Sequence, residues 1–181
     1  ARVEEAQAAR DARVAVYRQT VLTAFQSVED QLTVLRTLRE QEPLRREAVD
    51  LAALVEQARA PLAEAAQGRS VQWQIAPDLP TVQGDATLLR QMLTELLANA
   101  LKFTRGRDPV CIAVGWERGA DGRFALTVQD NGAGFNPAQA AGLFGIFQRL
   151  HRESEFDGVG AGLAAVRAIV RRHGGEARAA A

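Results

Sequence analysis

The sequence predicts an α+β fold, a two-layer α/β sandwich in which helices cover one face of a β-sheet, with a long helix at the N-terminus. Residues 85–103 have the three- and four-residue apolar spacing of an amphipathic helix. Residues 110–116 and 124–128 read as two short strands joined as a hairpin, and glycine-rich loops separate them from a last helix. Antiparallel strands with segregated helices are typical of an α+β sandwich.

Composition excludes several functional classes. The 181 residues hold 22 basic and 22 acidic side chains, and no basic block is present, so nucleic acid is not an expected partner. No apolar run is as long as a membrane span, and no signal peptide opens the sequence. The single cysteine, Cys111, cannot form an internal disulfide and suits a reducing compartment. We therefore expect a cytoplasmic protein, or the soluble part of a larger or membrane-associated sensor.

Residues 1–42 are predicted to form one long helix. They contain no proline or glycine, and apolar residues recur every seven positions at Val14, Val21, Val28 and Leu35. Such a heptad repeat needs a partner helix, since one helix cannot bury its own apolar stripe. The run A-F-Q-S-V-E-D-Q-L at 24–32 resembles a coiled-coil helix of outer-membrane efflux channel proteins. That resemblance implies a packing helix and carries no enzymatic residues.

Residues 43–68 are predicted to connect this helix to a domain spanning residues 69–181. Asp50 is a candidate N-cap for a second helix, Pro61 should kink or split that helix, and Gly68 should end it. Residues 70–75 then alternate between polar and apolar side chains, which indicates a half-buried strand.

The helix predicted at residues 85–103 has a polar edge beside its apolar face. Asp85 is its expected N-cap, and Glu95, Asn99 and Lys102 follow at i, i+4 and i+7. At ~100° per residue these three lie within about 60° of one another. A carboxylate, an amide and the only lysine of the chain suit a phosphate and its metal ion. From this helix alone, a solvated helix flank is an equal alternative.

Two glycine clusters follow. In D-N-G-A-G-F, residues 130–135, glycines permit positive φ and close approach of the backbone to a flat ligand. Asp130 ends a strand, and its carboxylate can only accept hydrogen bonds, which suits an amino group such as that of adenine. An ordinary Asp-Asn-Gly turn is the alternative.

The second cluster, G-V-G-A-G-L at residues 158–163, precedes a helix. Free N–H groups and the positive end of the helix dipole there would face an anion. No strand leads into it, so the dinucleotide fingerprint is excluded, and the Gly-Lys-Ser/Thr ending of a Walker loop is absent.

Taken together, these motifs resemble the catalytic, ATP-binding domain of sensor histidine kinases. Residues 95–103 match the N box, 130–135 the G1 box, 143–147 the F box and 158–163 the G2 box. The wider family, with the Bergerat ATP-binding fold, includes DNA gyrase, heat-shock chaperone ATPases and mismatch-repair proteins. The amino-acid sequences at residues 102–108 and 147–151 are most similar to those of phytochrome-like or PAS-linked sensor kinases.

The resemblance implies ATP and Mg²⁺ as cofactors and a role for each matching residue. Asn99 would bind Mg²⁺, Lys102 would neutralise phosphate charge, and Asp130 would bind the adenine amine. The remaining ATP-binding residues would be Gly132, Gly134, Phe135, Phe144, Phe147, Gly158, Gly160, Gly162 and Leu163.

Glu95 is the expected catalytic residue, although its reaction stays open. In a kinase it would polarise the attacking imidazole, whereas the hydrolysing relatives use a glutamate here to activate water. The family's acceptor helix is missing, and the only histidines, His151 and His173, stand where the family has non-acceptor histidines. We expect a phosphoacceptor histidine domain and a response regulator in trans, as parts of a two-component phosphorelay. The alternatives are an ATPase or protein-serine kinase, or an efflux-derived helical fusion with a vestigial ATP domain.

Overall fold

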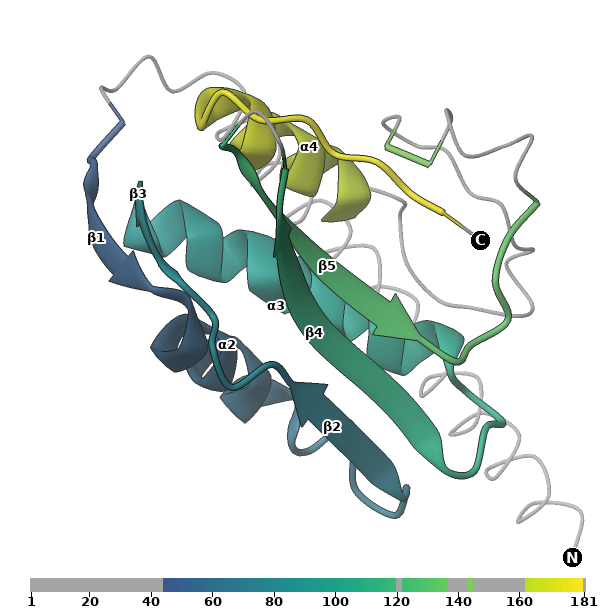
Figure 1. Cartoon of the computed structure of the whole chain (residues 1–181). Coiled ribbons are helices and arrows are strands. Elements are labelled where there is room, and N and C mark those ends of the chain that lie inside the picture. Colours follow the sequence, from purple (N-terminus) through teal and green to yellow (C-terminus); the bar gives the residue numbers. More distant parts are fainter. Residues whose placement is uncertain (1–43, 120–121, 137–142, 145–161, 181) are drawn as a thin grey trace, which may run out of the picture.

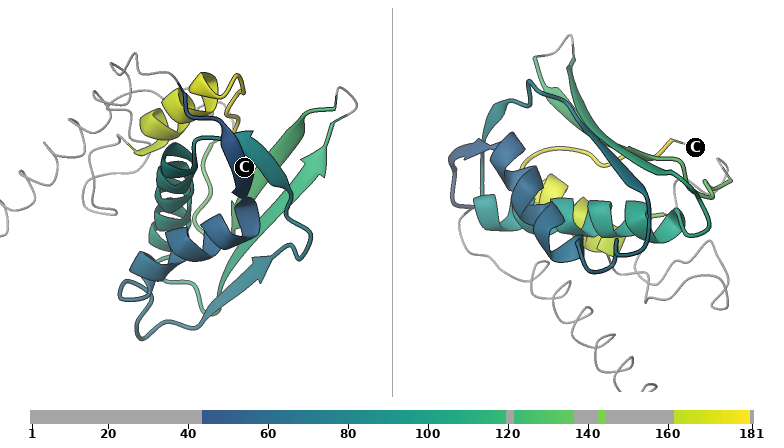
Figure 2. Two further views of the ribbon diagram at one scale, coloured as in Figure 1. Left: turned by 90° about the vertical axis from the view of Figure 1, so that its left-hand side faces the viewer. Right: turned by 90° about the horizontal axis from the view of Figure 1, so that it is seen from below.

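Three helices cover one face of a mixed β-sheet in a computed structural model of the chain (Figures 1 and 2). The structure describes residues 44–119, 122–136, 143–144 and 162–180. The predicted helix at 1–42 lies outside these residues, as do Phe147, Gly158 and Gly160. The arrangement confirms the predicted α+β sandwich.

The sheet contains three strands in the order β2-β4-β5, namely Val71–Ile75, Val110–Arg118 and Phe124–Asp130. β4 and β5 form the predicted antiparallel hairpin, with Val114 opposite Val128. β2 pairs with β4 in parallel, so the expectation of purely antiparallel strands was wrong. The reason is that a helix crosses between these two strands, and such a crossover returns the chain in the same direction.

A second, two-stranded sheet was not predicted. β1, Glu47–Asp50, pairs antiparallel with β3, Thr81–Gly84, so that Val49 lies opposite Val82. Each strand has only four residues, and β3 follows directly after Pro80 in a segment that reads as loop. This pairing places the N-terminus of the following helix.

α3, Ala86–Phe103, is the central helix, and it packs against α2, Leu51–Arg59, on one side and α4, Gly162–Arg172, on the other (Figure 1). The Asp85 carboxylate accepts from the N–H groups of Thr87 and Leu88, as predicted for its N-cap. Asp50 caps α2 in the same way. Within the part of the chain that the structure describes, no helix is long and apolar enough to cross a bilayer.

One apolar core joins the helices and the sheet. Leu93 and Leu97 of α3, Val55 of α2, Ile169 of α4 and Ile112 of β4 are all fully buried. α2 ends at Arg59, and a 3-10 turn, Ala60–Leu62, contains Pro61, which splits the predicted helical segment. The polar edge of α3 lies at the boundary of this core, since Glu95, Asn99 and Lys102 are half-buried.

Arg69 fixes the C-terminal end of α3. Its guanidinium donates to the carbonyl oxygens of Leu101 and Thr104, each at 2.8 Å, and to the Thr104 hydroxyl at 3.0 Å. Thr104 is fully buried, and its hydroxyl is 2.9 Å from the Ala100 carbonyl oxygen. Carbonyls in the last turn of a helix have no intrahelical partner, so a cation here satisfies them and matches the helix dipole.

Candidate functional site

The candidate site is formed where the polar edge of α3 meets the first residue of α4. A Cβ atom at Gly162 would lie 2.4 Å from Oε2 of Glu95 and 3.7 Å from Nδ2 of Asn99. Gly162 thus lies against the Glu95 side chain and near that of Asn99, although it follows these residues in the chain by 67 and 63 positions. The first turn of a helix has N–H groups without intrahelical partners and carries partial positive charge. Glu95 and Asn99 lie beside this turn of α4.

Glu95, Asn99 and Lys102 lie on one edge of α3, and all three are half-buried. Lys102 Nζ lies 5.0 Å from the centroid of the Phe103 ring, which is a cation–π distance. The spacing predicted from the sequence therefore gives one row of carboxylate, amide and ammonium groups, at the boundary between core and surface.

The loop after β5 is attached to the end of α3. The Ala133 N–H donates to the Phe103 carbonyl oxygen at 3.1 Å, and the Gly132 N–H donates to Oδ1 of Asp130 at 2.8 Å. A Cβ at Gly132 would lie 2.5 Å from the Phe103 carbonyl oxygen. Gly132 is thus required by close approach of two backbones, whereas Gly134 is required by its positive φ of 65°.

Asn131 anchors the same loop to the start of β4, a role that the sequence did not indicate. Its Oδ1 accepts from the Cys111 N–H at 2.9 Å, and its Nδ2 donates to the Pro109 carbonyl oxygen at 3.0 Å. Arg107 adds a hydrogen bond of 3.0 Å to the Gly132 carbonyl oxygen. A side chain that presents both a donor and an acceptor is suited to bridging two strands. These hydrogen bonds hold the end of β5 in place, and Asp130, the last residue of that strand, is exposed.

The other predicted residues are placed differently. Phe135 and Leu163 are half-buried, while Phe144 is 8% exposed and belongs to the apolar core. Phe144 therefore contacts the core of the domain rather than standing free on a loop.

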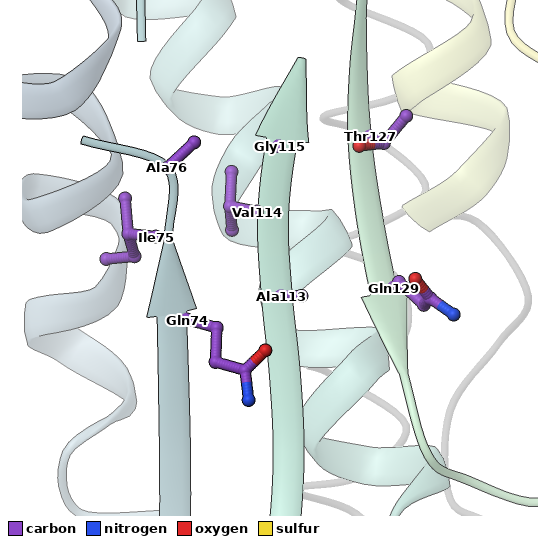
Figure 3. Close-up of a pocket in the computed structure, with 8 residues that line it drawn as sticks. All are labelled: Gln74, Ile75, Ala76, Ala113, Val114, Gly115, Thr127 and Gln129. Carbon is purple, nitrogen blue, oxygen red and sulfur yellow. The ribbon is translucent and has the colours of Figure 1, made fainter. Parts of the chain in front are cut away.

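A shallow depression of about 370 Å³ lies elsewhere, on the sheet face opposite the helices (Figure 3). Its lining includes Gln74, Ala113, Gly115, Thr127 and Gln129, and it contains no charged side chain and none of the predicted ATP-binding residues. This depression and the candidate site are therefore separate features.

The oxygen ligands of the candidate site fit a Mg²⁺ ion that is coordinated by the protein and by nucleotide phosphates together. Within the described part of the chain, no three His, Cys, Asp or Glu side chains gather into a set that could hold a metal by themselves. Mg²⁺ normally keeps waters and substrate phosphate oxygens in its coordination sphere and takes only one or two protein oxygens. The Asn99 amide, beside the Glu95 carboxylate and the start of α4, provides ligands of this kind.

Comparison with known proteins identifies the family. The family of histidine kinase-, DNA gyrase B- and HSP90-like ATPases matches residues 84–180, which is more than half of the chain. The chain belongs to this family. The matched residues include the segments of the predicted N, G1, F and G2 boxes, and the match confirms the predicted ATP-binding domain.

The individual relatives include a phytochrome and a sensory kinase. Cyanobacterial phytochrome A of Nostoc sp. is 42% identical over 97 residues, which are 54% of this chain and 12% of that protein. The adaptive-response sensory kinase SasA of Synechococcus sp. is 36% identical over 112 residues, 61% of this chain and 29% of that protein. The chain thus spans less than a third of these two relatives.

Solved structures agree with the fold. The crystal structure of full-length ShkA in complex with AMPPNP has a TM-score of 0.69 and 27% identity, covering 90% of this chain and 34% of ShkA. The likeness extends beyond the residues of the family match.

Proposed function

We propose that the chain binds Mg-ATP between α3, the loop after β5 and the N-terminus of α4, and transfers the γ-phosphate to a histidine supplied in trans. The observation that carries this proposal is the contact of Gly162 with Glu95 and Asn99. It joins the polar edge of α3 to a helix N-terminus, which together offer an anion both a positive dipole and side-chain ligands.

The adenine end of the nucleotide is assigned to Asp130. One oxygen of its carboxylate accepts the Gly132 N–H, and a carboxylate has a second oxygen for another donor. The adenine 6-amine is such a donor. Gly132 and Gly134 would shape the pocket around the ring because neither carries a side chain.

The phosphate end is assigned to Asn99, Lys102, Gly162 and Leu163. Lys102 contributes positive charge, and the first N–H groups of α4 point out of the helix. Asn99 would hold Mg²⁺, which, when bound, supplies positive charge to the phosphate oxygens. Phosphoryl transfer depends mainly on such positioning and charge neutralisation.

Glu95 is assigned as the general base. In the transfer, an imidazole nitrogen forms a bond to the γ-phosphorus as the bond from that phosphorus to the β–γ bridging oxygen breaks, and ADP leaves. The imidazole proton would pass to the Glu95 carboxylate. A general base must lie within hydrogen-bond reach of the proton that it removes from the acceptor.

A second candidate is ATP hydrolysis, and the position of Glu95 supports it. The carboxylate is half-buried beside the start of α4, where it could equally activate a water molecule. A protein-serine kinase would use the same base on a hydroxyl group. The three reactions differ in the group that accepts the phosphate: an imidazole, a water molecule or a hydroxyl group. None of these acceptors is part of the candidate site.

The partners follow from the proposed reaction. A phosphoacceptor histidine domain would supply the imidazole, and a response regulator would receive the phosphate in a two-component phosphorelay. Residues 1–42 would pack on a partner helix, and the chain would act in the cytoplasm.

The fate of labelled γ-phosphate tests the proposal. The chain is incubated with γ-labelled ATP and Mg²⁺, with and without a dimerisation domain that carries an acceptor histidine. Label that appears on this histidine, and is lost in Glu95→Gln, supports the kinase. Release of free phosphate at the same rate without any acceptor domain would support the ATPase instead.

A further inference from the structure

His173, directly after α4, joins the C-terminal end of that helix to Asp85, the N-cap of α3. Its Nε2 accepts a hydrogen bond from the Asp85 N–H at 3.1 Å, and its Nδ1 lies 2.8 Å from the Ile169 carbonyl oxygen. For Nε2 to accept, the proton of the neutral ring must be on Nδ1, which then donates to Ile169. Both nitrogens are thus used, one within α4 and one between the helices.

Gly84 leaves room for this imidazole. A Cβ at Gly84 would lie 3.1 Å from two atoms of the His173 ring and 2.7 Å from Cδ1 of Leu89. Gly84 ends β3 and precedes the N-cap Asp85, so the ring packs directly against backbone. A side chain packed on backbone has little freedom to shift.

The two helices have matching lengths between their points of contact. Gly162, at the start of α4, and His173, directly after its end, are eleven residues apart. Asp85, the N-cap of the antiparallel helix α3, and Glu95 are ten residues apart. At ~1.5 Å per residue these spans agree to within about one residue. With His173 held at Asp85, Gly162 falls opposite Glu95.

The rest of the α4 interface is apolar. Its buried residues are Ala164, Ala165, Val166, Ala168 and Ile169, and Val166 and Ile169 belong to the main core. Large side chains that fill grooves of a neighbouring helix help to keep two helices in register. A hydrogen bond also requires a defined distance and direction, so the contact of His173 with Asp85 adds an axial constraint that apolar packing alone does not provide.

We propose that His173 is a positioning residue: its hydrogen bond to Asp85 sets the register of α4 on α3 and so places the start of α4 against Glu95 and Asn99. The inference rests on the proposed ATP site for its functional consequence. Its structural content, the register of the two helices, is independent of the ligand.

Three variants of the 181-residue chain separate this role from a general loss of stability. His173→Asn keeps a donor toward Ile169 but has no group that reaches Asp85. His173→Gln places an amide oxygen near the former Nε2 and so can still accept from Asp85. Ile169→Val trims a fully buried residue of the same helix and serves as the stability control.

Two measurements are made on each variant: Mg-ATP affinity by calorimetric titration, and hydrogen exchange of the amides in residues 162–166. We expect His173→Asn to weaken binding by about tenfold and to speed exchange at 162–166, with the other two variants within about threefold of wild type. Equal effects of His173→Asn and Ile169→Val, or of His173→Asn and His173→Gln, would overturn the inference.

The hydrogen-exchange measurement also distinguishes failure of the proposed ATP binding from failure of the proposed role of His173. If the wild-type chain does not bind Mg-ATP, the proposed function fails, but faster exchange in His173→Asn alone still supports the register role. If His173→Asn does not fold, Gly84→Ala replaces it, because the added methyl group would press on the imidazole at 3.1 Å, and on the flexible end of Leu89 at 2.7 Å, while keeping the imidazole itself intact. Unchanged exchange at 162–166 in Gly84→Ala would then contradict the role of His173.

Discussion

Gly162 lies so close to Glu95 that a single methyl group at Gly162 would come within 2.4 Å of the Glu95 Oε2. The contact connects the first turn of one helix with the middle of another, and the side chain concerned is a flexible carboxylate. A methyl group there would move the carboxylate while leaving the backbone in place.

Gly162→Ala is therefore expected to impair activity without impairing stability. Alanine favours a helix over glycine by up to about 1 kcal/mol, so the melting temperature should stay equal or rise. The proposed phosphotransfer should fall by about tenfold or more, which corresponds to ~1.4 kcal/mol of lost transition-state stabilisation. Thermal unfolding and labelled-phosphate transfer measure the two effects, and a parallel decline in both would contradict the account.

Gly132→Ala should cost more than Gly134→Ala. At Gly132 the new Cβ would meet the Phe103 carbonyl oxygen at 2.5 Å, and that backbone cannot rotate away. Overpacking of this kind typically costs about 1–3 kcal/mol, and it should also displace the loop that carries Asp130. Gly134→Ala meets no neighbour and has only the strain of a positive φ, about 1–2 kcal/mol.

Denaturant unfolding and Mg-ATP titration of both glycine variants provide the comparison. ATP affinity should fall much further in Gly132→Ala than in Gly134→Ala. The reverse order would show that backbone conformation, not close approach, is what the loop needs.

The local elements of this fold follow from the sequence, because their causes lie within a few residues. Asp85 and Asp50 cap their helices through N–H groups two and three positions away, and the β4–β5 hairpin follows from alternating residues around a short connection. The four-residue strands β1 and β3 were missed because neither has enough alternation to stand out, and their pairing joins distant segments.

The candidate site also has features that the sequence predicts and features that depend on packing between distant segments. The row Glu95, Asn99 and Lys102 could be predicted from helical spacing alone. The contact of Gly162 with Glu95, and that of His173 with Asp85, depend on how α4 lies on α3, which helical periodicity does not specify. The motifs indicated the ligand class, and only the packing of the two helices shows which residues touch.

Arg69→Met is expected to destabilise the end of α3. The change removes three hydrogen bonds and leaves the carbonyl oxygens of Leu101 and Thr104 without that cation. A hydrogen bond to a charged group contributes about 1.5–3 kcal/mol, so we expect a loss of roughly that size in the free energy of unfolding.

The matched control is Arg59→Met. Arg59 pairs with Glu56 on the helix surface and lies 5.6 Å from the centroid of the Trp73 ring. Exposed pairs of this kind contribute about 0–1 kcal/mol. Denaturant unfolding of both variants decides the matter, and equal losses would mean that Arg69 is not the main support of the α3 terminus.

Asn131→Asp should destabilise the loop after β5 although it changes few atoms. The new carboxylate can still accept from the Cys111 N–H but can no longer donate to the Pro109 carbonyl oxygen, which it then faces as a second acceptor. We expect a cost of about 1–3 kcal/mol in the free energy of unfolding. Gln129→Glu, an exposed amide-to-carboxylate change on the preceding strand β5, is the control and should be close to neutral. If the two variants lose the same amount, Asn131 is no anchor.

The chain is proposed to bind Mg-ATP through Asp130 and the polar edge of α3. Calorimetric titration of Mg-ATP into the wild-type chain and into Asp130→Asn is the decisive measurement. We expect saturable binding by the wild type and a loss of about tenfold or more in Asp130→Asn, with the melting temperature of the free chain unchanged. Negligible binding by both would rule out this binding mode and would support a vestigial ATP domain.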